Sequence, residues 1–136
     1  MRKSITQKND FGCGIACFAF AANVSYEQAE AWLGQEQANS NRFYVKDFRK
    51  ALIKHGLNYS SKHMKPQNRQ LLKKDGAIVL IRRSKNYPSG HYLIRYENTW
   101  MDPWINLRID NNIANAESGF RKQLPGSAMY VLYPEL

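Results

Sequence analysis

The strongest restriction on the fold comes from a cysteine that stands between two glycines and is followed by an apolar run. Cys13 lies between Gly12 and Gly14, and residues 15–22 are all apolar, with a composition typical of helices. They predict a helix over residues 14–23 that is buried at the centre of the molecule. The N-terminus of a helix carries free N–H groups and partial positive charge. It therefore favours a reactive thiolate at Cys13.

Three more helices are predicted in the first half of the chain. Ser25 has a capping pattern and begins a helix that ends at a glycine, over residues 25–34. Residues 35–42 are polar and are expected to form a loop. An apolar stripe opposite a basic face predicts a helix over residues 45–55. A proline suited to the first turn of a helix predicts a short one over residues 66–74.

The second half of the chain is rich in predicted strands. Residues 77–81 form a continuous apolar run of strand length, which predicts a central strand. Residues 91–96 and 99–102 flank a short Glu97-Asn98 turn and predict a hairpin. Further short strands are expected over residues 57–61, 106–112 and 129–133, and residues 114–122 are expected to be helical.

The composition supports one domain over residues 1–136. The chain is 43% hydrophobic, which is enough to bury a core, and we find neither an internal repeat nor a long linker. Helices first and strands second are typical of an α+β domain in which N-terminal helices pack on an antiparallel sheet. The two cysteines, Cys13 and Cys17, do not form a disulfide scaffold and favour a reducing, cytoplasmic setting.

The N-terminal residues leave an alternative for the location of the protein. Arg2 and Lys3, followed by apolar residues, resemble a signal peptide, so secretion or export is the alternative to a cytoplasmic location. Asn9 and Asp10 interrupt that pattern. No run approaches the roughly 18 apolar residues that a membrane helix needs, so we expect no membrane span.

The basic character of the chain bears on its partners. The formal net charge is +9 and the pI is about 9.7. This charge suits an acidic partner or substrate, and the basic face of the predicted helix at residues 45–55 could steer one. Tyrosines beside basic residues, as in Arg42-Phe43-Tyr44, would also suit a nucleic-acid binder. The chain contains no nucleic-acid motif, so we expect no specific nucleic acid.

Three polar residues supply what a reactive cysteine needs. His91 begins one strand of the predicted hairpin and Asp102 ends the other, so both are expected at the same end. Asp102 can then orient the imidazole, whose other nitrogen faces the Cys13 thiol. Gln7 can donate its side-chain amide to an oxyanion, together with the Cys13 backbone N–H. A zinc site from Cys13, Cys17 and histidines is a weaker alternative, and we expect no metal or cofactor.

Together these motifs resemble a known family. Gln-x5-Cys-Gly-x-Ala near the N-terminus, Gly-His-Tyr on a strand and Asp-Pro after the next strand resemble the papain-like peptidases that cleave double-glycine leaders of bacteriocins, cysteine peptidase family thirty-nine. The resemblance implies a papain-like fold and a bacterial thiol protease without a cofactor. It implies Cys13 as nucleophile, His91 as base, Asp102 as the residue that orients the base, and Gln7 as oxyanion donor.

The resemblance leaves the substrate open. Domains of this family often precede an ABC transporter, so it implies a peptide or protein substrate and a membrane transporter as partners. The interval from His91 to Asp102 is shorter than in the family, which a tight turn at Glu97-Asn98 would explain. Two alternatives use the same fold. One is a catalytically silent peptide-binding domain, and the other is an acyl transferase or amidase with the same catalytic residues.

Overall fold

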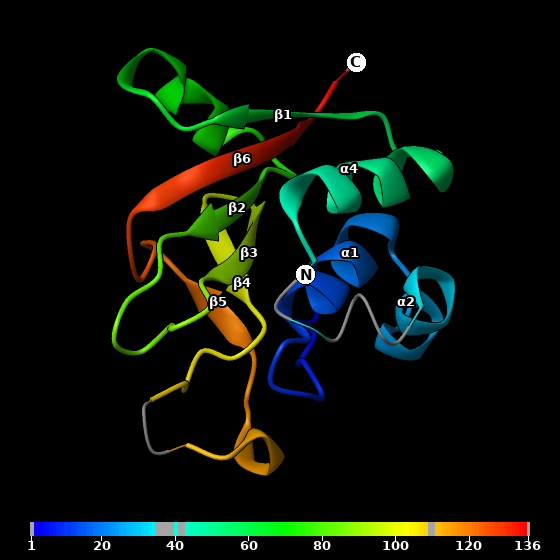
Figure 1. Cartoon of the computed structure of the whole chain (residues 1–136), viewed down its shortest axis with the longest axis vertical. Coiled ribbons are helices and arrows are strands. Elements are labelled where there is room, and N and C mark those ends of the chain that lie inside the picture. Colours follow the sequence, from blue (N-terminus) through cyan, green and yellow to red (C-terminus); the bar gives the residue numbers. More distant parts are fainter. Residues whose placement is uncertain (1, 35–39, 41–42, 109–110, 136) are drawn as a thin grey trace.

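The α-helices of the described chain lie on one side of a β-sheet, as Figure 1 shows. The computed structural model describes residues 2–34, 40, 43–108 and 111–135. Helix α1 packs against strand β3 of the sheet and against helix α2, while α4 packs against strand β1. The helices are α1 (Cys13–Ala22), α2 (Tyr26–Leu33) and α4 (Val45–Lys54), and the 3-10 helices are η1 (Pro66–Lys73) and η2 (Ile113–Asn115).

Helix α1 is the central helix, as its apolar sequence predicts. Seven of its ten residues are buried. The helix ends at Asn23, whose φ of 58° places it in the left-handed region that often terminates helices. The Arg2 guanidinium donates a hydrogen bond of 2.6 Å to the Phe20 carbonyl and lies 3.7 Å from the centre of the Phe20 ring. This cation therefore satisfies a carbonyl at the negative end of the helix dipole.

The described strands form one antiparallel sheet with the order β1-β6-β2-β3-β4-β5. This confirms the expected α+β class. The apolar run at residues 77–81 supplies β2, which lies between β6 and β3. Its place inside the sheet explains why all its residues except the partly buried Leu80 are buried. The strands are β1 (Tyr59–His63), β2 (Ile78–Ile81), β3 (His91–Tyr96), β4 (Thr99–Asp102), β5 (Gly119–Arg121) and β6 (Ala128–Pro134).

Both faces of the sheet are covered. Ile78 lies beside Ile94 and Leu132, and these side chains join the core between the sheet and the helices. Val79 lies beside Leu93, and both belong to a second core, against which partly buried leucines of η1 pack. The alternation of neighbouring residues between the two cores is the period of two that a strand imposes.

Two predicted elements are wrong. Residues 114–122 do not form a helix, because η2 is followed by strand β5, which pairs with β4. This long-range pairing outweighs the local helical preference of the alanines. Residues 103–106 form turns and the described residues 107, 108, 111 and 112 are not in a strand. Residues 109–110 of that predicted strand, and residues 35–39 and 41–42 of the predicted loop, lie outside the described residues.

A two-residue turn fixes the end of the hairpin. Glu97 and Asn98 have φ angles of 46° and 66°, the pair of positive values that a type I′ turn requires. Tyr96 pairs with Thr99 directly across the turn. This register explains the short interval between His91 and Asp102, because only Glu97 and Asn98 connect the two strands. Strand β1 lies two residues further along the chain than the strand predicted over residues 57–61, since it runs from Tyr59 to His63.

Candidate active site

Cys13 is the first residue of α1. The first hydrogen bond of the helix runs from the Ala16 N–H to the Gly12 carbonyl, so the N–H groups of residues 13–15 precede the helical ladder. The thiol is partly buried and lines a cleft. A Cβ atom on Gly14 would lie 2.5 Å from the Phe43 ring, so glycine is required there for the helix to lie this close to Phe43. The helix start therefore presents both a thiol and free amide donors.

His91 and Asp102 form a buried pair, as their places in the hairpin predict. The His91 Nε2 atom lies 2.7 Å from Asp102 Oδ1, and the two side chains are 3% and 0% exposed. The Trp104 backbone N–H donates a 3.0 Å hydrogen bond to the same oxygen. Since Nε2 faces the carboxylate, Nδ1 is the ring nitrogen left to interact with Cys13.

The protonation of this pair follows from its contacts. Burial lowers the pKa of His91, but its hydrogen bond to Asp102 and its interaction with Cys13 raise the pKa to about 9. Burial raises the pKa of Asp102, but the hydrogen bond and charge of His91, together with the hydrogen bonds from Trp104 and Arg121, outweigh this effect and lower it. At neutral pH the imidazole is therefore protonated and the carboxylate is ionised.

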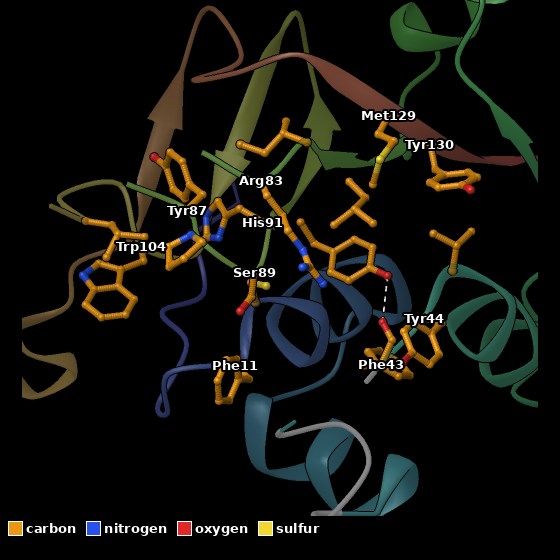
Figure 2. Close-up of a pocket in the computed structure, with 18 of the residues that line it drawn as sticks. Phe11, Phe43, Tyr44, Arg83, Tyr87, Ser89, His91, Trp104, Met129 and Tyr130 are labelled. Atoms are coloured by element: carbon orange, nitrogen blue, oxygen red, sulfur yellow. Dashed lines mark hydrogen bonds between the residues drawn. The ribbon is translucent and has the colours of Figure 1, made fainter. Parts of the chain in front are cut away.

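Two residues that were not predicted from the sequence also contact the His91–Asp102 pair. Arg121 Nη1 lies 3.0 Å from Asp102 Oδ2, in an ion pair that joins β5 to β4. The Tyr87 ring stacks on the His91 ring, with centroids 4.9 Å apart and planes 27° apart, and Figure 2 shows the two rings together. Arg121 falls in the segment wrongly predicted as a helix, which hid its approach to Asp102.

Gln7 lies in the same cleft, but its amide is already engaged. The side chain is 2% exposed, and Nε2 donates hydrogen bonds of 3.0 Å to the Asn9 carbonyl and 3.4 Å to the Asp10 carbonyl. Its Oε1 atom has no hydrogen-bond partner among the described residues. The Gln7 backbone N–H donates to the Pro103 carbonyl at 3.2 Å, which fixes this segment beside Asp102. An oxyanion would have to replace the longer of the two amide hydrogen bonds.

The cleft has a volume of about 840 Å³ and lies between the helical part and the sheet. Residues from the N-terminal segment, α1, α4, β1, the β2–β3 loop and the segment after β4 line it. Two exposed aromatic side chains, Phe11 and Tyr44, stand at its rim, and the dashed line in Figure 2 marks the 2.9 Å hydrogen bond from Tyr92 to the Phe43 carbonyl. A cleft of this size can hold several residues of an extended peptide.

The remaining cysteine and histidines make other contacts, although His63 also lines the cleft. Cys17 is fully buried. Burial, and to a smaller extent the charge of Cys13, raises the pKa of the Cys17 thiol well above its ordinary value. His55 stacks on Trp32, and His63 packs against Tyr130. Across the described residues there is no group of three or more side chains suited to hold a metal ion. Among the described residues, no helix combines the length and the apolar character needed to cross a membrane.

Comparison with known proteins identifies the fold. No protein-family model matches the chain, and no curated protein matches it. The chain is similar to a solved structure, the crystal structure of a double-glycine motif protease from an AMS/PCAT transporter in complex with the leader peptide. The two are 17% identical, with a TM-score of 0.57, over 97% of this chain and 89% of that one. The helices and the six-stranded antiparallel sheet are those of the papain-like fold.

Proposed function

We propose that this chain is a cysteine peptidase that cleaves a peptide bond in a peptide or leader substrate. The observation that carries the proposal is the buried His91–Asp102 pair, whose His91 lines the same cleft as Cys13 at the start of α1. A thiol at a helix N-terminus beside a protonated imidazole is the arrangement that makes sulfur nucleophilic near neutral pH. The papain-like fold of a double-glycine protease supports the same conclusion.

In the first step the Cys13 thiolate attacks the carbonyl carbon of the scissile bond. A carbon–sulfur bond forms, and negative charge develops on the carbonyl oxygen. The Cys13 N–H and the Gln7 amide donate to that oxyanion. The His91 imidazolium then gives its proton to the leaving nitrogen. The carbon–nitrogen bond breaks and the amine leaves, so that the acyl group remains on sulfur as a thioester.

In the second step water completes the hydrolysis. Neutral His91 takes a proton from the water as it attacks the thioester, the carbon–sulfur bond breaks, and the thiolate and imidazolium are restored. Asp102 holds the imidazole with Nε2 toward itself in both steps. Its charge favours the imidazolium, since the pKa of His91 is raised to about 9. Arg121 does not contact the reacting atoms and acts by holding Asp102.

The test uses synthetic peptides that contain a Gly-Gly pair, because the similar solved structure is a double-glycine motif protease bound to a leader peptide. Mass spectrometry after incubation should show cleavage on the carboxyl side of Gly-Gly. The Cys13→Ala variant should form no product. The Cys17→Ala variant is the matched control, because Cys17 is buried away from the cleft, and it should retain activity. Equal products with Cys13→Ala would exclude a Cys13 nucleophile.

A second candidate function is peptide binding without cleavage. The hydrogen bonds of Gln7 to the Asn9 and Asp10 carbonyls favour it, because they occupy the donor that an oxyanion would need. In that case the unmodified chain would bind a Gly-Gly peptide and release it intact. Fluorescence anisotropy and mass spectrometry on the same sample separate the two functions. Binding with no product after many binding lifetimes would identify the silent form.

A further inference from the structure

The cleft is lined by cations far more than by anions. One acidic residue, Asp10, lines it among the described residues. The Lys and Arg side chains at the cleft are all exposed, and none of them enters an ion pair with another described residue. They come from α4, β1, the β2–β3 loop and the segment after β4, so they surround the cleft rather than crowd one wall. These cations are Lys46, Lys62, Arg83, Lys85 and Arg108.

Arg83 is placed to meet a bound substrate. It lies two residues after β2, in the loop that leads to His91. Figure 2 shows its side chain pointing into the cleft, with the guanidinium at the end that faces the open space. A guanidinium presents its N–H donors in a fixed fork that matches a carboxylate, and such charge-assisted bonds are about twice as strong as neutral ones. Arg83 is therefore available to a carboxylate from outside the chain.

We propose that the cleft selects peptide segments with acidic side chains near the scissile bond, and that Arg83 is the residue that recognises them. The inference rests on the proposed function for the place of the bond, but the preference is a property of binding. Clefts lined by one sign of charge focus their field and concentrate ligands of the opposite sign. Lysine or arginine in the substrate would meet repulsion at the same position.

A basic cleft with aromatic residues at its rim is also a pattern found in single-stranded nucleic-acid binders. The observations favour a peptide because Cys13, His91 and the amide donors at the start of α1 line this same cleft, and they are suited to an acyl group. Tighter binding of a nucleic acid than of a peptide is therefore one of the results that would contradict the inference.

The experiment measures binding to the Cys13→Ala variant, so that no probe is consumed. The probes are fluorescein-labelled ten-residue peptides around a central Gly-Gly, with uncharged residues elsewhere except at one scanned position, which carries Glu, Gln or Lys. At low salt we expect the Glu peptide at the best position to bind about five-fold more tightly than its Gln counterpart, and the Lys peptide to bind more weakly still. Added salt should reduce the difference.

Two substitutions on this background test Arg83. Arg83→Glu should abolish or reverse the preference for Glu over Gln, whereas Arg83→Lys should retain part of it. Arg69→Glu is the matched control, because it makes the same change of charge on an exposed arginine of η1 that does not line the cleft. It should leave the preference unchanged. Far-ultraviolet circular dichroism establishes that each variant is folded.

Three results would overturn the inference. One is equal binding of the Glu and Gln peptides at every position. Another is an equal loss of preference in Arg83→Glu and Arg69→Glu, which would reduce the effect to net charge. The last is tighter, Arg83-dependent binding of a fluorescein-labelled single-stranded 12-mer oligonucleotide. Hydrolysis by the unmodified chain is assayed separately. A chain that binds Glu peptides selectively and cleaves none refutes the peptidase and keeps the preference.

Discussion

Both carboxylate oxygens of Asp102 have partners, although the side chain is completely buried. Oδ1 accepts hydrogen bonds from His91 and Trp104, and Oδ2 pairs with Arg121. A buried carboxylate without such partners would take up a proton. The three donors keep Asp102 ionised, and its charge in turn keeps the proton on His91. Arg121 also competes with His91 for that charge, so β5, which does not line the cleft, influences the protonation of the proposed catalytic base.

Replacing Asp102 with Asn should move the alkaline limb of the pH profile of kcat/KM to lower pH. In the native chain, kcat/KM should fall as His91 loses its proton, with a midpoint near pH 9. Asp102→Asn keeps an oxygen for the hydrogen bond but removes the negative charge, so the pKa of His91 should fall and the limb should move to lower pH. We expect activity to fall at least about a hundredfold. An unshifted limb in pH profiles of kcat/KM would show that Asp102 does not set the pKa of His91.

Replacing Arg121 should move the same limb in the opposite direction. Arg121→Met removes a cation that competes with His91 for the charge of Asp102. The pKa of His91 should therefore rise, and the alkaline limb should move to higher pH. Arg121→Lys keeps the charge and should leave the limb near its native position. If both variants lose activity equally with no change in the pH profile, Arg121 contributes only to packing.

The two cysteines should differ in reactivity. Burial raises the pKa of Cys17, so its thiol should resist alkylation in the folded chain. Cys13 is only partly buried and lines the cleft together with His91, and a cationic imidazole near a cysteine increases the reactivity of its sulfur. Iodoacetamide at pH 6 should modify Cys13 alone, about ten-fold faster than in the His91→Ala variant. Peptide mapping by mass spectrometry checks the site. Modification of Cys17 at a similar rate in native conditions would contradict this.

At the scale of elements, the turn before β3 aims His91. Gly90 has a φ of 77°, and a Cβ atom there would lie 2.9 Å from the Ile81 carbonyl of β2. Gly56 has a φ of 86° with nothing within 4 Å of its Cβ position, so it is a matched control. Alanine at either position should cost about 1 kcal/mol of unfolding free energy, because of the left-handed φ.

Gly90→Ala should have two further effects. Its methyl group meets a backbone carbonyl inside the sheet, so the loss of unfolding free energy should exceed that of Gly56→Ala. The displacement falls next to His91, so kcat should also fall, whereas Gly56→Ala should leave kcat unchanged. Urea denaturation and peptide hydrolysis measure the two effects. A Gly90→Ala variant with native kcat would show that the turn does not position the imidazole.

Elements with strong local signals could be predicted from the sequence, and those built by distant pairing could not. The apolar run after Gly14 predicted α1, and the two strands flanking Glu97-Asn98 predicted the hairpin that brings His91 to Asp102. Strand β5 has three residues and no period of its own, so its pairing with β4 decides its structure. The ion pair of Arg121 with Asp102 therefore could not be predicted from the sequence. The same holds for the position of Arg83 in the cleft.

At the scale of the whole molecule, the site exists only in the complete fold. Its residues come from the N-terminal segment, the start of α1, the helical side of the cleft and both halves of the sheet. A buried ionised pair between β3 and β4 therefore couples protonation to folding as well as to chemistry. In the unfolded chain His91 is exposed to water and has its ordinary pKa of about 6.5. In the folded chain its pKa is about 9.

This difference predicts a loss of stability in mild alkali. Since the folded chain binds the His91 proton more tightly, its contribution to stability is complete below about pH 6.5. It is lost as the pH rises through about 9. The unfolding free energy from urea denaturation should fall by on the order of 3 kcal/mol between pH 6 and pH 10. His91→Gln, which can still hydrogen-bond with Asp102, should flatten that fall. An equal fall in both chains would assign the loss of stability to other groups. It would contradict a protonated His91 at neutral pH.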